Sequence, residues 1–363
     1  MALAEINEER YLPQFIETLF QLKPFYDWIT KYSSGSTNRK YLTPKELMIK
    51  VEIPDLHHKE QVDFQDRINF FKSCGLFSRL THQQTLLKKL RQQILQEAIE
   101  GKLSKDWRAK NPDIEPASEL LKRIQAEKAQ LIKDKRIKKQ KPLPPISEEE
   151  KPFALPNGWT WCRLGEPSNG FQYGTSSKSL EKGDVPVLRM GNIQNGKIIW
   201  DGLVYSSDVE DIEKFNLIEG DLLFNRTNSR ELVGKTGLYK GDKKSIYAGY
   251  LVRFHMASEI DANYTNFVMN SPLHNEWCNE VKTDAIGQSN INATKLSNFR
   301  FPLPSLPEQK AIVAKVEKLL ALCDQLESQI TRNQSHVEQL MQAVLKKAFS
   351  QNTTQTEAVA GTA

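Results

Sequence analysis

The sequence predicts an α+β protein, in which a mixed α/β domain is joined to long helices that pair in an antiparallel, coiled-coil-like manner. Two observations predict this class. Residues 157–310 contain short β-branched and aromatic runs between glycine-containing turns, which is typical of antiparallel strands. Residues 308–347 contain neither glycine nor proline and place an apolar residue at every third or fourth position.

Composition excludes several classes of protein. Apolar residues make up 39% of the 363 residues and charged residues 26%, which is typical of a globular protein. No apolar run is long enough to span a membrane, and the acidic N-terminus has no signal-peptide pattern, so we expect a cytoplasmic protein with no membrane partner. The four cysteines are widely separated, which predicts reduced, mostly buried thiols and no zinc site.

An internal repeat organises the chain. Val51–Gln61 matches Phe299–Gln309 without a gap, and Leu90–Ile99 matches Leu340–Phe349. The second copy is preceded by strand- and turn-rich residues 159–263, for which the first copy has no counterpart. We therefore expect the first copy to be the C-terminal remnant of a domain.

The expected organisation has six segments. They are a domain remnant (1–62), a central helical region (63–141), a proline-rich linker (142–156), a complete domain (157–310), a long helix (311–349) and a disordered tail (350–363). Within the complete domain, strands are expected at 159–164, 185–190, 197–199, 221–224, 236–239 and 250–254, followed by helical pattern at 263–281.

The long helix contains a heptad seam that another helix must cover. Its members are Ile312, Val316, Leu319, Cys323, Leu326, Ile330, Asn333, Val337, Leu340 and Val344. The candidate partner is the apolar stripe around Leu90 and Ile94, which is followed by Gly101 as a helix cap. Asn333 is the one polar member, and it either fixes the register of the pair or is a solvated position at a bend.

Residues 118–141 carry the strongest local charge. They contain nine lysines and arginines against three acidic residues, whereas the whole chain has a net charge of only +5. Two interpretations stay open. The cations favour the C-terminal end of a helix dipole, or they contact nucleic-acid phosphates.

Polar and basic side chains lie on turn-like segments of the complete domain. Arginine, asparagine and glutamine can distinguish base edges in the major groove, and serine, threonine and lysine can bind phosphates. Loops in general are also rich in such residues, but their spread over several loops of one domain favours binding. The candidate DNA-binding residues are Thr175, Ser177, Lys178, Arg189, Asn192, Arg226, Asn228, Ser229, Arg230, Lys235, Gln288, Asn290 and Asn292.

Sequence patterns of catalysis are missing. Ser229–Thr236 is one residue away from a phosphate-binding loop, but Gly237 and Gly241 follow and exclude the helix that such a loop requires. Metalloprotease and nucleophile-elbow motifs are absent, and the six histidines are scattered. We therefore expect no catalytic residues, no metal and no cofactor in this chain.

Four motifs resemble the specificity-subunit (HsdS) family of type I restriction–modification systems. They are LPNGWTWCRLGE (155–166), GDLLFNRTNS (220–229), IGQSNIN (286–292) and FPLPSLPEQKAIV (301–313). The resemblance implies that residues 157–310 are a target recognition domain that reads one half of a bipartite site in double-stranded DNA. It also implies that the helices set the spacer and dock a methyltransferase (modification) subunit, which a restriction/translocase subunit joins.

By the same resemblance, S-adenosylmethionine, ATP and magnesium belong to those partner subunits. The chain departs from the family in lacking most of a first recognition domain. We therefore expect one chain to read one half-site, paired with a second copy in a homodimer or with a complementing half-subunit. The alternatives are a coiled-coil scaffold that reads no DNA, an inactive truncated remnant, and an enzyme of unrecognised chemistry.

Overall fold

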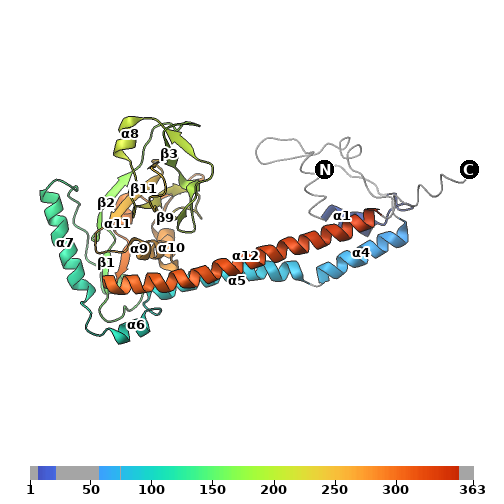
Figure 1. The fold of residues 1–363 in the computed structure, drawn as a ribbon, viewed down its shortest axis with the longest axis horizontal. Helices are drawn as coiled ribbons and strands as arrows, with labels where there is room; N and C mark the ends of the chain where they lie inside the picture. Colours follow the sequence, from blue (N-terminus) through green and yellow to red (C-terminus); the bar gives the residue numbers. More distant parts are fainter. Residues whose placement is uncertain (1–6, 22–56, 74, 351–363) are drawn as a thin grey trace, which may run out of the picture. The chain divides into compact units, whose positions relative to one another are not determined.

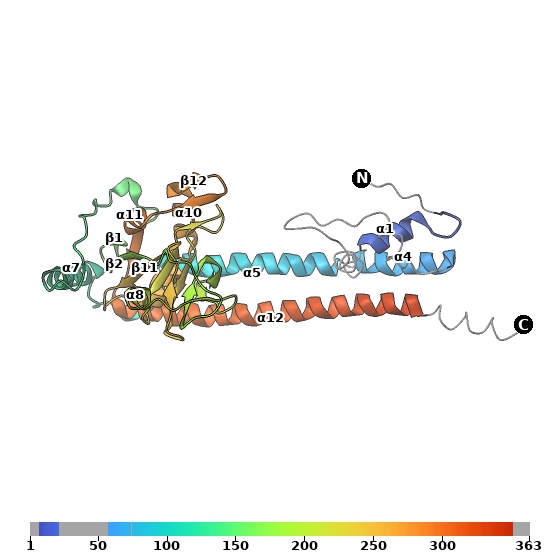
Figure 2. The same ribbon diagram turned by 90° about the horizontal axis from the view of Figure 1, so that it is seen from above.

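The structure, a computed structural model, describes residues 7–21, 57–73 and 75–350 (Figure 1). The chain divides into two compact units, formed by residues 1–87 with 324–363 and by residues 88–323. Two long helices, α5 (Leu76–Ile99) and α12 (Leu306–Ser350), have residues in each unit (Figure 2). Among the described helices, none has the length and apolar character needed to cross a membrane.

The first unit is helical in its described part. It contains α1 (Pro13–Gln21), α4 (His58–Ser73) and the adjoining parts of α5 and α12. The apolar faces of α1 and α4 pack together, with the rings of Phe15 and Phe64 edge to face at 5.3 Å. This small core consists of Phe15, Ile16, Phe64 and Ile68.

The second unit contains the remaining helices and all described strands. Its helices are α6 (Lys105–Lys110), α7 (Ala117–Lys133), α8 (Val209–Lys214), α9 (Ala262–Val268), α10 (Pro272–Val281) and α11 (Ala293–Ser297), with short 3₁₀ turns η1 (Glu148–Glu150) and η2 (Met190–Asn192). Its first seven strands are β1 (Thr160–Arg163), β2 (Ser168–Tyr173), β3 (Val185–Leu188), β4 (Ile193–Gln194), β5 (Lys197–Ile198), β6 (Val204–Ser206) and β7 (Leu222–Asn225). The others are β8 (Thr227–Asn228), β9 (Thr236–Leu238), β10 (Ile246–Tyr247), β11 (Leu251–Met256), β12 (Thr283–Ala285), β13 (Gln288–Asn290) and β14 (Arg300–Leu303).

The strands form one large sheet and three small ones. The large sheet has the order β2-β11-β7-β9-β5-β4 and is antiparallel except for the β5–β9 pair. The small sheets are β10-β3-β6, β12-β13-β8 and β1-β14. This confirms the predicted mixed, mostly antiparallel fold. All six predicted strands are present, and the predicted helix at 263–281 is two helices, α9 and α10.

The first and last strands of the domain at residues 157–310 close it at one edge. β1 pairs antiparallel with β14, with Cys162 opposite Phe301. The buried side chain of Arg163 donates to the Asn298 carbonyl at 3.1 Å and to the Glu150 carboxylate at 2.8 Å. The chain therefore enters and leaves the domain at neighbouring points, next to the start of α12.

The repeat is visible in the structure as a shared hydrogen-bond arrangement. The buried Gln309 amide accepts from the Asp261 N–H at 2.8 Å, directly before α9. The buried Gln61 amide accepts from the Leu12 N–H at 2.7 Å, directly before α1. In each unit, a glutamine near the start of a long helix thus holds the first turn of a second helix. Residues 22–56, which include most of the matched first-copy segment, lie outside the described residues.

The apolar seam of α12 changes along the helix. Ile312, Val316 and Cys323 are buried, whereas Leu326 and Leu340 are about half exposed. A residue period of 3.5 drifts by ~20° per heptad around a straight α-helix, so a stripe that begins in a buried seam leaves it after several turns.

Of the two interpretations of Asn333, the structure agrees with the solvated position. Its side chain is exposed, and the next residue, Gln334, accepts a hydrogen bond from Gln84 of α5 at 2.9 Å within the first unit. The polar contact therefore lies one position further along the helix. Leu319, Ile330 and Val337 are partly buried, Ile94 is buried, Leu90 is exposed, and the Val344 side chain lies outside the described residues.

Two helix ends refine the sequence prediction. α7 begins at Ala117, directly after Pro116. Proline at the boundary has the extended backbone that precedes a helix and no N–H to satisfy. Gly101 has the left-handed conformation expected of a helix C-cap, with φ +69°.

Candidate nucleic-acid interface

Two of the predicted binding segments are joined by strand pairing. β8 pairs with β13, with Asn228 opposite Ser289 and Thr227 opposite Asn290. The N–H of Ile291 donates to the carbonyl oxygen of Arg226 at 2.9 Å and extends this pairing by one residue. Residues 226–230 and 288–292, which are distant in sequence, therefore form one surface.

A third segment reaches this surface at the end of β2. The Arg226 guanidinium lies over the ring of Tyr173, 4.7 Å from its centroid. Gly174 follows immediately, and a Cβ added there would lie 2.2 Å from the Tyr247 carbonyl oxygen, which only glycine permits. This close approach holds the start of the loop 174–178 next to Arg226.

Arg226 keeps hydrogen-bond donors available. Its Nη1 has one long contact, 3.5 Å, to the Gly249 carbonyl, and among the described residues its buried Nε has no partner. Stacking on Tyr173 fixes the plane of the guanidinium, and the Tyr173 hydroxyl is itself held by the Ala293 N–H at 3.0 Å. A fixed arginine fork with unused donors has the geometry for bidentate recognition of guanine or of a phosphate.

The fourth predicted segment lies elsewhere. Asn192 is buried and donates to the Ile199 and Asp201 carbonyls at 3.0 and 2.9 Å, while its side-chain oxygen accepts from the Arg189 N–H. The exposed Arg189 guanidinium donates to the Gly202 carbonyl at 2.8 Å. This segment leads into β4, at the opposite edge of the large sheet from β2. The structure therefore does not bring Arg189 and Asn192 together with the other candidates.

Thr175 is also used inside the protein. It is buried, its hydroxyl hydrogen-bonds to the Asp211 carboxylate, and its oxygen accepts from the Ser177 N–H at 3.0 Å. The result is a fixed turn that exposes Ser177 and Lys178. Thr175 therefore positions the loop, and the two following side chains are available to a ligand.

Three asparagines on the surface formed by residues 226–230 and 288–292 make hydrogen bonds within the protein. Asn290 donates to the Thr227 hydroxyl at 2.7 Å, and Asn292 caps α11 by accepting from the Lys295 N–H at 2.8 Å. Asn228 accepts from the N–H of the next residue at 2.8 Å. These contacts leave each amide with free hydrogen-bonding capacity, since one side-chain amide offers two donors and an acceptor.

Arg230 and Gln288 are two further exposed polar side chains of this surface. Arg230 is 71% exposed, and its Nε lies 3.9 Å from the Asp284 carboxylate. An exposed pair at this distance is worth at most about 1 kcal/mol, so a phosphate can displace it. Ser229 and Lys235 are half-buried at the edges of the same loop.

The sequence prediction missed three side chains on this surface. Tyr173 and Tyr250 are 41% and 52% exposed, and Ile286 is fully exposed at the tip of the β12–β13 hairpin. Tyr173 belongs to β2, whose sequence SNGFQY has no alternating pattern and was not predicted as a strand. An apolar residue directly before Gly287, which has a φ of +78°, is the signal that could have revealed Ile286.

The segment that resembles a phosphate-binding loop is a turn between strands. The chain turns at residues 230–234, where Gly234 has a φ of +95°, and β9 follows. No helix N-terminus is available there, as the sequence predicted. Among the described residues, no group of three histidine, cysteine or acidic side chains could hold a metal ion.

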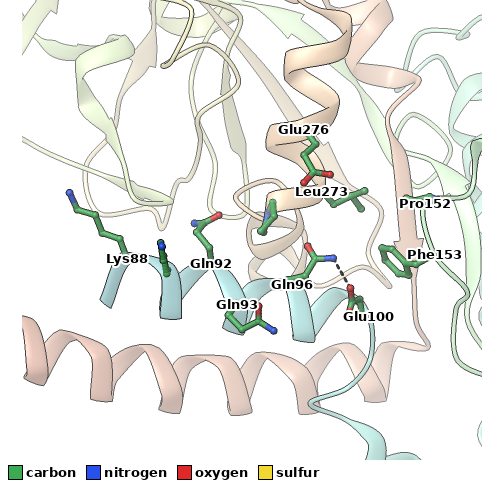
Figure 3. A pocket seen from close by; sticks show the side chains of 11 residues that line it. Lys88, Gln92, Gln93, Gln96, Glu100, Pro152, Phe153, Leu273 and Glu276 are labelled. Atoms are coloured by element: carbon green, nitrogen blue, oxygen red, sulfur yellow. Dashed lines mark hydrogen bonds between the residues drawn. The ribbon is translucent and has the colours of Figure 1, made fainter. Parts of the chain in front are cut away.

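A groove of about 560 Å³ lies between α5, α10 and the chain at 152–153 (Figure 3). Glutamines of α5 dominate its α5 side, and Gln96 donates to Glu100 at 2.8 Å within it (Figure 3). Asn275 of α10 reaches Gln92 at 3.4 Å. None of the candidate DNA-binding residues lines this groove, which lies between α5 and the domain at residues 157–310.

Comparison with known families places the domain. The family described as "Type I restriction modification DNA specificity domain" matches residues 157–333. The type I restriction enzyme EcoEI specificity subunit of Escherichia coli is 32% identical over 302 residues, covering 78% of this chain and 48% of the relative. The EcoAI specificity subunit of the same species is 37% identical over 273 residues, covering 71% and 44%. The chain thus spans about half the length of these curated relatives.

One solved structure resembles most of the chain. It was reported under "Structural basis underlying complex assembly and conformational transition of the type I R-M system", and the likeness covers 94% of this chain and 72% of that chain. The TM-score is 0.54 at 18% sequence identity. At this identity, the likeness concerns the fold.

Proposed function

Because the chain belongs, through residues 157–333, to the type I restriction modification DNA specificity domain family, we propose that it is the DNA sequence-specificity subunit of a type I restriction–modification complex. Its recognition domain would read one half of a bipartite target in double-stranded DNA. The observation that carries this proposal is the convergence of segments 174–178, 226–230 and 288–292 on one surface, around the stacked guanidinium of Arg226.

The chemistry of this surface suits base and backbone recognition. The Arg226 fork matches the two acceptors of guanine, and the exposed Gln288 amide matches the donor and acceptor of adenine. Ser177, Lys178 and Arg230 surround them as exposed phosphate ligands. The partly exposed rings of Tyr173 and Tyr250 add apolar area at the same place.

The helices would dock the partner subunits. Within the second unit, α5 and α12 each carry a leucine that is about half exposed, namely Leu90 and Leu322. An apolar contact would remove these side chains from water, which is favourable by roughly 25 cal/mol per Å². We propose a methyltransferase subunit as this partner, with the restriction/translocase subunit joining it. Methyl transfer and ATP-driven steps, with S-adenosylmethionine, ATP and magnesium, would then belong to those subunits and not to this chain.

Methylome sequencing of a host that carries this chain with its cognate methyltransferase tests the proposal. R226A should abolish methylation at the motif of the unmodified protein, because a bidentate contact is worth about 1–3 kcal/mol. R226K keeps the charge but loses the planar fork, so it should also lose the motif. R189A, at the opposite edge of the sheet, should leave the motif unchanged.

Assembly with the methyltransferase is the control for folding. Co-purification of the R226A and R226K variants with that subunit should match the unmodified chain. Unchanged methylation of the same motif by R226A would contradict recognition by this surface. It would favour a chain that acts only as a helical scaffold.

A further inference from the structure

A cluster of exposed cations follows α7. Six cations lie within nine residues, with Asp134 as the one acid among them, and every one of the six side chains is exposed. None of the six forms an ion pair with any residue that the structure describes. We call them the α7 basic segment: Lys133, Lys135, Arg136, Lys138, Lys139 and Lys141.

The end of the helix accounts for only part of this cluster. The Lys135 N–H donates to the Ile132 carbonyl at 3.1 Å and the Arg136 N–H to the Leu131 carbonyl at 2.9 Å, which closes the helix in a Schellman motif. Lys135 occupies the left-handed position, φ 57°, that usually belongs to glycine. A helix dipole acts only within its last turn, so it gives no reason for the charges at 138, 139 and 141.

The basic segment is held against the recognition domain on both sides. Before it, Lys128 donates to the carbonyls of Gly165 and Glu166 at 2.7 and 2.9 Å. Within it, the side-chain nitrogen of Gln140 donates to the Gly165 carbonyl at 3.1 Å, and its side-chain oxygen accepts from the Gly170 N–H at 3.2 Å. The uncharged side chains at 137 and 140 are partly buried, and the cations face outward. The segment is therefore a fixed part of the second unit (Figure 1).

β2 connects this segment to the candidate DNA-reading surface, which is formed by residues 174–178, 226–230 and 288–292. Gly170, which Gln140 contacts, is three residues before Tyr173, on which Arg226 stacks. At ~3.3 Å per residue, the two points are about 10 Å apart along the strand. This is far less than the ~34 Å of one turn of B-DNA, so a duplex contacting Arg226 has backbone phosphates within reach of the basic segment.

We propose that the α7 basic segment is a second DNA-contact surface, which binds backbone phosphates beside the half-site without reading sequence. This inference rests on the proposed function, since the duplex is placed by the reading surface. An acidic protein surface would also suit six cations. Duplex DNA is favoured because the segment is fixed to the recognition domain at Gly170, which lies about 10 Å along β2 from Tyr173 of the reading surface.

The salt dependence of DNA binding by the complex of this chain with its cognate methyltransferase tests the proposal. K138Q/K139Q/K141Q removes three exposed cations that lie beyond the helix and leaves α7 intact. K102Q/K105Q/K110Q, on exposed positions at and near α6, removes the same net charge and is the matched control. Affinities for duplexes with and without the motif are measured by fluorescence anisotropy between 50 and 200 mM salt.

The first triple should lower the slope of log K against log[salt] by up to about 2.7, at ~0.9 for each phosphate that is no longer neutralised. Raising the salt from 50 to 200 mM lowers the affinity of both complexes, and the loss should be up to about 40-fold smaller for the triple variant than for the unmodified complex. The decrease should be equal on both duplexes, so that their affinity ratio is unchanged, and the control triple should change the slope little. An unchanged slope, or equal changes in both triples, would overturn the proposal.

Two further results separate the possible failures. Weaker capture of the methyltransferase by K138Q/K139Q/K141Q, with an unchanged slope, would assign the segment to an acidic protein partner and overturn the DNA contact. A lowered slope together with a motif preference that R226A leaves intact would uphold the phosphate contact and reject the reading surface. Loss of motif preference in R226A with no effect of the triple would do the reverse.

Discussion

Replacing Glu308 with alanine should destabilise the junction between the recognition domain and its helices. The Glu308 carboxylate, in the first turn of α12, is 2% exposed and accepts three hydrogen bonds. They come from the Ser104 hydroxyl at 2.7 Å, the Arg108 guanidinium at 2.5 Å and the Trp159 indole N–H at 2.9 Å. These donors belong to the start of α6 and to the entry of the recognition domain, so one side chain joins three elements.

The magnitude follows from burial. Arg108 is only 21% exposed, and removing one partner of a buried ion pair costs about 3–5 kcal/mol, because the other charge stays buried and unpaired. E308Q keeps the shape and one oxygen acceptor, so we expect a smaller cost of about 1–3 kcal/mol. E317A, an exposed position on the same helix, should change the free energy of unfolding by less than about 0.5 kcal/mol.

Urea unfolding followed by tryptophan fluorescence measures this cost, and Trp159 reports from the junction itself. A double-mutant cycle with R108A should give a coupling energy of about 0.5–3 kcal/mol. An E308A cost within about 1 kcal/mol of that of E317A, or no coupling with R108A, would refute the assignment of this junction as a buried charge pair.

Three further predictions concern the same fold. Burial lowers the pKa of His274 from 6.5 to about 3, so the unfolded chain binds a proton that the folded chain does not, and stability is lost as the pH falls through this window. H274F should remove this sensitivity, and the unmodified protein should lose about 3 kcal/mol more than H274F between pH 7 and pH 4 in urea unfolding. G174A should cost about 1–3 kcal/mol in thermal unfolding because its Cβ meets backbone, whereas G191A, with no atom within 4 Å, should be near neutral; equal effects would contradict the close approach. Q309A and Q61A should each speed amide hydrogen exchange in the helix that the glutamine holds, because the loss of a buried acceptor lowers the free energy of local opening by ~1–3 kcal/mol. Faster exchange only in the other unit would contradict this role.

The candidate site was partly predictable from the sequence. Arg226, Arg230 and Gln288 were found by residue type on turn-like segments, because donor geometry is a property of the side chain. The buried Thr175 and Asn192 have the same chemistry but are engaged in internal hydrogen bonds. Polar type alone does not distinguish a side chain that binds a ligand from one that supports a turn, since both need donors and acceptors.

Periodicity and motif spacing by themselves determined the α+β class, six strands, the long C-terminal helix and the repeat, because these depend on local backbone preference and on alternating burial. The tertiary structure alone decided which loops meet. Pairing of β8 with β13 and stacking of Arg226 on Tyr173 are contacts between segments far apart in the chain, and no local pattern specifies them. The same holds for Asn333 and Gln334, because the position of the partner helix decides which face of α12 is covered. A sequence pattern that repeats every 3.5 residues predicts this face only approximately, since a straight α-helix has 3.6 residues per turn.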